Sequence, residues 1–329
     1  MVRSGATFAD AAAEYVRYAE YDRGCKPSTL QGYRSMVRAH LLPAFGDLPI
    51  ESVTTEGIER WIATVNGSPR TRNKLLILLH GVLRRARKLY RLPGNAASEV
   101  EKFPQRRSGD IQVFSPEVVM ALVRAAQSDQ DAAIYLTAAF TGLRRGELLA
   151  LHWRDVDFAG SVIRVRGSFA AGALTTPKSG RVRSVPMASE VARCLAQLGQ
   201  RGSWTDEDDL VFVGELGTYL DGSALRRRYD ATLTRAGLRR LRFHDLRHTF
   251  GTRMIAKADI RRVQEWMGHA DVQTTMKYLH YAPRADDARL VAQAFGGAAP
   301  RFDGAERLTQ ALEPRPAPSQ ETRGRGWSR

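Results

Sequence analysis

Residues 141–148 read Thr141-Gly142-Leu143-Arg144-Arg145-Gly146-Glu147-Leu148 and follow an apolar stretch from Ile134 to Phe140. The apolar stretch predicts a helix that ends at the glycine, and a new helix is expected to begin with Arg144 at its N-terminus. Free backbone N–H groups and the helix dipole favour an anion at such a place, and a guanidinium adds two directed donors. An arginine that pairs with Glu147 or with solvent would explain the same residues equally well.

A second basic stretch reads Phe243-His244-Asp245-Leu246-Arg247-His248. His244 and Arg247 are three residues apart, so on a helix they share a face, whereas Leu246 and Phe250 point to another face and into the core. A histidine and an arginine presented together suit phosphate binding with proton transfer. The motif alone is weak.

Two further segments carry a histidine and a tyrosine. Val263-Gln264-Glu265-Trp266-Met267-Gly268-His269 predicts a helix that stops at the glycine, with His269 just past its rigid end. Thr274-Thr275-Met276-Lys277-Tyr278-Leu279-His280-Tyr281 follows on an expected helix at 271–281. There Val272, Met276 and Leu279 share one face, which leaves Tyr278 to project elsewhere. Taken singly, a lone histidine is more often structural and a lone tyrosine usually packs.

The composition points to a polyanionic partner. The 329 residues include 50 Lys and Arg against 35 Asp and Glu, a formal net charge of +15. Such a charge favours nucleic acid over acidic membranes or a merely solubilising role. The two cysteines, Cys25 and Cys194, match no metal spacing and are expected to be reduced thiols. Without a secretory signal or a membrane-spanning run, a cytoplasmic protein with no membrane partner is expected.

Residues 1–100 are expected to form a helical domain. Helices are predicted from near Thr7, from Ser28 to about Leu42, at 55–65 and at 69–90, with Thr7 and Ser28 as capping residues. The last of these helices is basic, and no acidic residue occurs between Arg60 and Ser98. A helix with charges of one sign repels itself unless something neutralises it. It is therefore interpreted either as a helix lying along DNA phosphates or as an ordinary basic face.

The rest of the chain divides into three parts. Residues 101–113 are expected to be a basic linker, 114–296 a mainly helical second domain, and 297–329 a disordered tail. Strands are predicted at 161–165 and 181–186, on either side of a turn at 175–180. The second domain is expected to begin its helices after Ser115 and to continue them at 189–198, 223–236, 244–256, 260–267, 271–281 and 284–294.

The ordered set T-G-L-R-x-x-E, a lysine (Lys178) in a β-turn, H-x-x-R, G-H and T-T-x-x-Y-x-H resembles the catalytic domain of the tyrosine recombinases, the phage integrase and Xer-type group. The resemblance covers residues 114–296 and departs at no motif position. Residues 1–100 resemble that family's four-helix core-binding domain through helix pattern alone. The resemblance implies a mainly α fold with a small antiparallel β-sheet: a helical N-terminal core-binding domain followed by an α+β catalytic domain.

The resemblance also implies roles for individual residues. Tyr278 would attack the scissile phosphate, forming a 3′-phosphotyrosyl link and freeing a 5′-hydroxyl, with no metal, cofactor or ATP. Glu147 would orient a neighbour. The remaining expected catalytic groups are Arg144 and Arg247 on the non-bridging oxygens, His269 donating to the same phosphate, His244 as the acid/base near the tyrosine hydroxyl, and Lys178 protonating the 5′-oxygen. The motif register favours Arg144 over Arg145, and Tyr278 over Tyr281.

The expected partners are double-stranded DNA at specific sites and further copies of the chain, a tetramer on DNA in this family. A helix from Asp286 to Phe295 would dock on a neighbouring protomer or pack on its own domain. An integrase of a phage or mobile element is favoured, with room for an accessory directionality protein. The alternatives are a non-catalytic DNA-binding protein of the same fold, a type IB topoisomerase or telomere resolvase, and a metal-dependent nuclease.

Overall fold

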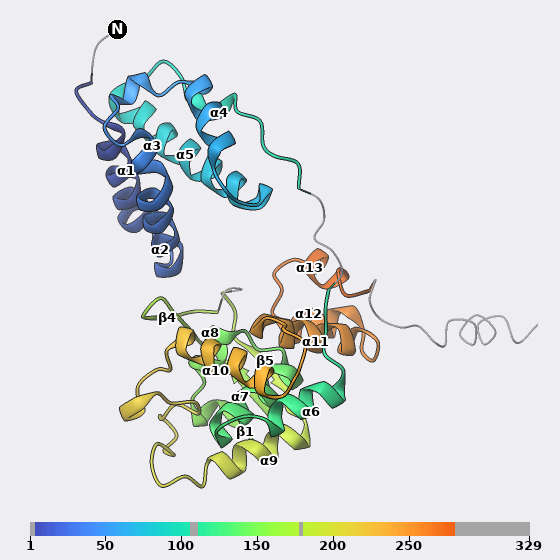
Figure 1. Cartoon of the computed structure of the whole chain (residues 1–329). Coiled ribbons are helices and arrows are strands. Elements are labelled where there is room, and N and C mark those ends of the chain that lie inside the picture. The colour runs from blue at the N-terminus through green and yellow to red at the C-terminus, as the bar shows by residue number, and fades with distance from the viewer. Residues whose placement is uncertain (1–3, 106–110, 178–179, 280–329) are drawn as a thin grey trace, which may run out of the picture. The chain divides into compact units, whose positions relative to one another are not determined.

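The computed structural model describes residues 4–105, 111–177 and 180–279. Lys178, the middle of the predicted linker, the predicted helix at 284–294 and the tail at 297–329 lie outside the described residues. The described chain is mainly helical with two small antiparallel sheets, which confirms the predicted fold class (Figure 1). One hydrophobic core uses residues between 6 and 103, and two others use residues between 111 and 279.

The described N-terminal residues, 4–105, contain five α-helices. The capping box of Thr7 and Asp10 is present as predicted. The predicted second helix is divided: Pro27–Met36 is α-helical, a π-helical turn spans Val37–Leu41, and a further α-helix follows. The predicted cap at Ser28 was wrong, because the helix begins earlier, with Lys26 as its N-cap and Pro27 in its first turn. The helices are α1 (Phe8–Arg17), α2 (Pro27–Met36), α3 (Leu42–Phe45), α4 (Thr55–Thr64) and α5 (Pro69–Tyr90).

Helix α5 is the apolar centre of this region and also its most basic element. Its Leu75, Leu79 and Val82 are fully buried, and the helix packs against α1. Arg85 pairs with Glu14 at 2.9 Å. Five other cations of α5 are exposed and form no ion pair within the described residues: Arg70, Lys74, Arg84, Arg87 and Lys88. The helix therefore combines a buried apolar face with exposed, unneutralised positive charge.

The second region packs its helices around α7 (Asp129–Thr141). Ile134 and Tyr135 of α7 are fully buried, and the Tyr135 ring meets that of Tyr229 edge-on at 5.4 Å. Helix α7 contacts α6, α9 and α11. The other helices are α6 (Pro116–Arg124), α8 (Arg145–Leu149), α9 (Ser189–Leu198), α10 (Gly222–Arg235), α11 (Phe243–Ile255), α12 (Ile260–Met267) and α13 (Val272–Met276).

Two antiparallel sheets complete this region. Strands β1 (Val156–Asp157), β2 (Val162–Val165) and β5 (Arg183–Pro186) form a sheet in the order β1-β2-β5. Both longer strands were predicted. The hairpin of β3 (Ser168–Ala170) and β4 (Ala173–Thr175) was not, because its strands are short and rich in small residues. Along β5 alternate side chains are buried, so Arg183 faces inward together with Val185.

The predicted facing of α13 was wrong. The regular α-helix ends at Met276, and the backbone N–H of Tyr278 donates to the carbonyl of Thr275 in a tighter turn. The 3.6-residue period therefore does not continue to residue 279. As a result Met276 is 39% exposed, and Tyr278, expected to project away from the buried face, is only 3% exposed.

Within the described ranges, no helix combines the length and the apolar character needed to cross a membrane.

The corner between α7 and α8 allows a test of the fold. Gly142 caps α7 with φ +65°, and a Cβ at this position would lie 2.5 Å from a ring carbon of Phe250. Gly142→Ala should lower the free energy of unfolding by about 2–4 kcal/mol, from the left-handed backbone together with overpacking. Gly172 has φ +76° and open space around it, so Gly172→Ala should cost only about 1 kcal/mol. Equal losses in urea denaturation would contradict the packing argument.

Candidate active site

Arg144 lies at the junction of α7 and α8, as predicted. It is the N-cap of α8, where its backbone N–H donates to Glu147 Oε2 at 2.8 Å. Its side chain donates to Glu147 Oε1 and to the carbonyl of Gly268, each at 2.9 Å. The guanidinium is thus paired with Glu147, and it still has 22% of its side-chain surface exposed.

Glu147 connects Arg144 to a second arginine that sequence reasoning missed. Arg183 donates to both carboxylate oxygens of Glu147, at 3.0 and 2.7 Å, and the Glu147 side chain has no exposed surface. Burial raises the pKa of Glu147, but the hydrogen bonds and charges of Arg183 and Arg144 outweigh it and leave the pKa below its ordinary value. A charged residue on the inward face of an alternating strand was the signal that could have identified Arg183.

Arg247 is a buried cation without a carboxylate partner. It is 2% exposed, donates to the carbonyls of Gly142 and Met267, and forms no ion pair within the described residues. Burial, and then the charge of Arg144, lowers its pKa to about 9. A buried charge that lacks a counter-ion is costly, so this position favours an anion supplied from outside.

Three arginines converge on the C-terminal end of α12. Arg183 donates to the carbonyl of Trp266 at 2.8 Å, Arg247 donates to that of Met267, and Arg144 donates to that of Gly268. The last carbonyls of a helix lack intrahelical partners and carry its negative dipole end. Gly268 caps the helix with φ +61°, and a Cβ there would lie 2.9 Å from Arg183 Nε. The arginines therefore fix the place from which the next residue, His269, projects.

His269 lies between the arginines and the tyrosine segment. Its Nδ1 is 2.9 Å from Thr275 Oγ1, and its ring is nearly parallel to that of Tyr278, with centroids 6.3 Å apart. Burial, followed by the charges of Arg247, Arg144 and Arg183, lowers its pKa to about 3. The ring is therefore neutral at neutral pH.

Tyr278 packs flat on α11. Its hydroxyl oxygen lies 2.9 Å from Nδ1 of His248, and a Cβ on Gly251 would be 2.8–2.9 Å from three ring carbons. Burial raises the pKa of Tyr278, and the charges of Arg247 and Arg144 oppose that rise. His244 lies one turn before His248, and the two rings meet edge-on at 4.9 Å. Partial desolvation and the neighbouring His248 lower the pKa of His244, although the side chain remains exposed.

The structure thus brings together five of the six predicted site residues: Arg144, His244, Arg247, His269 and Tyr278. The sixth, Lys178, and the competing Tyr281 lie outside the described residues. Arg145 turns away and donates to the carbonyl of Gly222. His248 was missed, although its four-residue offset from His244 placed both on one helix face. Among the described residues, no group of three or more His, Cys, Asp or Glu side chains could hold a metal ion.

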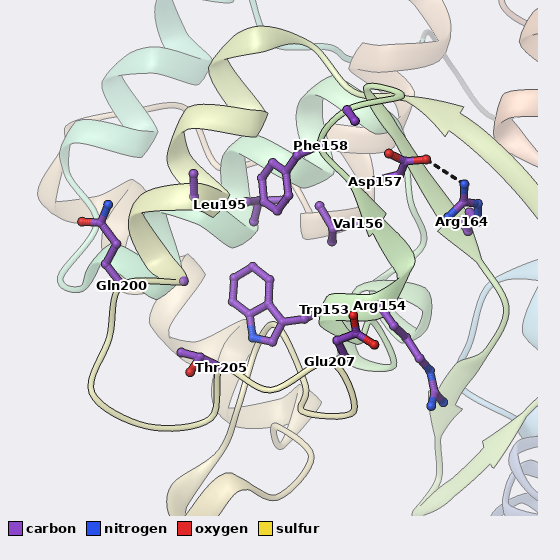
Figure 2. Close-up of a pocket in the computed structure, with 13 residues that line it drawn as sticks. Trp153, Arg154, Val156, Asp157, Phe158, Arg164, Leu195, Gln200, Thr205 and Glu207 are labelled. Atoms are coloured by element: carbon purple, nitrogen blue, oxygen red, sulfur yellow. Dashed lines mark hydrogen bonds and ion pairs between the residues drawn. The ribbon is translucent and has the colours of Figure 1, made fainter.

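A separate hollow lies beside β1 and α9 and encloses about 640 Å³ (Figure 2). Phe158, Val156 and Leu195 line it together with Trp153, and the Asp157–Arg164 ion pair lies at its edge at 2.7 Å. It shares no lining residue with the arginine and tyrosine cluster.

Comparisons with known proteins identify the family of this chain. The model of the phage integrase family matches residues 112–284, and that of the phage integrase N-terminal SAM-like domain matches residues 7–65. The tyrosine recombinase XerC of Corynebacterium efficiens is 30% identical over 288 residues, which cover 84% of this chain and 87% of the relative. A XerC-like tyrosine recombinase of Caldanaerobacter subterraneus is 29% identical over 220 residues, which cover 59% of this chain and 54% of the relative.

Two solved structures share the fold. The Tn1549 transposon integrase in complex with transposon right end DNA has a TM-score of 0.71 at 20% identity, with 88% of this chain and all of that chain covered. A lambda integrase tetramer bound to a Holliday junction has a TM-score of 0.65 at 18% identity, with 82% of this chain and 79% of that chain covered.

The buried carboxylate gives a stability test. Glu147→Gln leaves Arg183 without a buried counter-ion and should lower the free energy of unfolding by about 3–5 kcal/mol at neutral pH. The pKa of Glu147 is lowered by folding, so the wild-type advantage is present above the ordinary value of 4.5 and is lost as pH falls through the folded-state pKa. Arg226→Gln, which removes a surface pair with Asp230, should change stability by less than about 1 kcal/mol. Denaturant titrations measure the loss of unfolding free energy in each variant. Equal losses in the two variants, or a loss in Glu147→Gln that does not change with pH, would refute the argument.

Proposed function

Because the chain belongs to the phage integrase family of tyrosine-type site-specific recombinases, we propose that it cuts and rejoins double-stranded DNA at specific sites through a covalent bond to Tyr278. The observation that carries the proposal is Arg247, a buried guanidinium without an ion pair in the described residues, whose charge acts on the Tyr278 hydroxyl. Such a site is complete only when an external anion enters, and the scissile phosphate is that anion.

The phosphate lies between the arginines and the tyrosine in this proposal. Arg144 and Arg247 hold the non-bridging oxygens with charge-assisted hydrogen bonds, which strengthen as negative charge develops in the transition state. His269 is neutral at neutral pH because its pKa is lowered to about 3. With Nδ1 engaged by Thr275, its Nε2–H donates to the same phosphate. His244 contacts the ring of His248 edge-on and thereby helps to hold that ring in place.

Attack by Tyr278 yields a 3′-phosphotyrosyl bond and a free 5′-hydroxyl, and Lys178 gives the departing oxygen its proton. The new bond retains the energy of the broken phosphodiester, so a second 5′-hydroxyl can reverse the step. The reaction therefore requires neither ATP nor a metal ion. Glu147 and Arg183 hold Arg144 in place and do not touch the DNA.

DNA contacts outside the site fall to the basic N-terminal region. Helix α5 presents exposed, unpaired cations that can neutralise phosphates, and residues 1–100 act as the core-binding domain. Related integrases have been solved on transposon-end DNA and as a tetramer on a Holliday junction. By analogy, four copies of this chain act together in the cytoplasm as the integrase of a phage or mobile element, with an accessory directionality protein setting the outcome.

The covalent step is tested with nicked suicide DNA from the flanks of the gene, incubated with the full-length protein in EDTA. Wild type and Tyr281→Phe should form a covalent protein–DNA adduct on a denaturing gel, and Tyr278→Phe should form none. An adduct that persists in Tyr278→Phe would move the nucleophile to Tyr281. If EDTA abolished the adduct, the metal-free reaction would be rejected. Specific binding without any adduct would favour a non-catalytic DNA-binding protein.

The neighbouring arginines supply a matched pair for the phosphate site. Arg144→Gln should slow single-turnover adduct formation by about 10²–10³, the usual loss for one electrostatic donor. Arg145→Gln removes an equal charge one residue away, from a side chain directed at the Gly222 carbonyl, and should leave the rate within about threefold of wild type. If both variants lost the same amount of cleavage rate, the effect would come from the overall positive charge and not from a specific contact of Arg144 with the phosphate.

A further inference from the structure

The tyrosine hydroxyl has a specific neighbour that the motif assignment did not use. Nδ1 of His248 lies 2.9 Å from Tyr278 Oη, which is ordinary hydrogen-bonding distance. His244 contacts the His248 ring, and no hydrogen bond joins it to Tyr278 within the described residues. Of the two histidines, His248 is therefore the one placed on the reacting oxygen.

This contact is built into α11. His248 and Gly251 are three residues apart on one face of the helix, and the Tyr278 ring occupies the space that a side chain at position 251 would need. The absence of a Cβ lets the ring lie against the helix backbone, while His248 contacts its hydroxyl end. The tyrosine is thus held in one orientation, with its oxygen at an imidazole nitrogen.

The surroundings of His248 keep its ring neutral. Burial lowers its pKa first of all; Asp245 opposes this, and Arg242, Arg247 and Lys277 add to the lowering. The other titratable groups around it are His244 on its own helix, Tyr278 after α13 and His269 after α12. A neutral imidazole with its hydrogen on Nε2 leaves the Nδ1 lone pair free to accept a proton.

We propose that His248 is the general base for Tyr278, accepting the hydroxyl proton at Nδ1 as the oxygen attacks phosphorus. The inference rests on the proposed recombinase activity and identifies the proton acceptor within the same site. The Oη–P bond forms and the bond from phosphorus to the 5′-oxygen breaks. The tyrosine proton moves to His248, and the 5′-oxygen receives a separate proton from the general acid. Reversal returns the proton from the His248 imidazolium to Tyr278 when the 5′-hydroxyl attacks.

The proposal makes His248 a catalytic residue and Gly251 a positioning residue. His244, one turn earlier on α11, then helps to hold the His248 ring in place through an edge-on ring contact. Asp245 is 4% exposed and is held by Arg242 at 2.9 Å, so it supports α11 without contacting the hydroxyl.

The test compares His248→Asn with wild type in single-turnover cleavage of the suicide DNA across a range of pH. Asparagine can still hydrogen-bond to the hydroxyl but cannot take up a proton. The rate at neutral pH should fall by about 10²–10⁴, the range for removal of a general base, with DNA affinity unchanged. The wild-type rate should decline at acid pH, below the ordinary imidazole value of 6.5, because the lowered pKa of His248 delays protonation of its ring to more acid conditions. In His248→Asn that acid limb should be absent, and the rate should keep rising toward alkaline pH as the tyrosine ionises.

A second variant separates proton transfer from structure. In His248→Ala, Tyr278 is replaced by a fluorinated tyrosine whose hydroxyl is more acidic. This replacement should raise the cleavage rate of His248→Ala by at least about tenfold, because a more acidic hydroxyl needs less help from a base. In wild type the same replacement should raise the rate only slightly. A structural defect would not respond to the acidity of the nucleophile.

The outcomes are distinct. If wild type forms the adduct and His248→Asn forms it equally fast, the role of His248 is overturned and the proposed function stands. The same holds if the fluorotyrosine brings no rescue in His248→Ala. Absence of the adduct in wild type would overturn the proposed function and the inference together.

Discussion

The C-terminal end of α12 is the constraint on which the site depends. Three successive carbonyls, those of Trp266, Met267 and Gly268, each accept from a different arginine. The arginines come from β5, α11 and the start of α8, so one helix end aligns three elements that are distant in sequence. The three arginines carry three positive charges, and Glu147, which pairs with Arg144 and Arg183, supplies one negative charge. The fold thus creates a local excess of positive charge and directs it at one place.

Arg183 and Arg247 differ in how their charge is balanced. Arg183 is 7% exposed and is paired through both of its terminal nitrogens with Glu147. Arg247 is 2% exposed and, among the described residues, has only carbonyl acceptors, whose partial charges offset less of the cost of burial than a carboxylate does. Glu147 therefore stabilises one side of the cluster and leaves the other side in need of an anion. The same carboxylate fixes Arg144 at the edge of the site, where it remains partly exposed.

Local rules predicted the parts of this site that depend on neighbours in sequence. The glycine at the end of α7, the arginine that caps α8 and the stop at Gly268 follow from capping chemistry, and the two longer strands follow from alternation. Arg183 and His248 were missed because their importance comes from partners 36 and 30 residues away along the chain. The facing of Tyr278 was wrong because the regular helix ends at Met276, and the Tyr278 ring packs on α11. The positions of these three side chains require the packed structure.

Under the proposed mechanism, burial and charge together explain why the tyrosine would need a neighbouring base. In the protein alone, burial raises the pKa of Tyr278 and the two arginines partly oppose that rise. A phosphate bound to those arginines adds negative charge close to the hydroxyl and cancels part of their field, which makes ionisation of the tyrosine harder at the moment when it must react. Electrostatic attraction for the substrate and activation of the nucleophile therefore oppose each other in this site. In the proposed reaction, an imidazole that contacts the hydroxyl, and is itself neutral because it is partly buried, removes the conflict, since it takes the proton without requiring a free phenolate beside the phosphate.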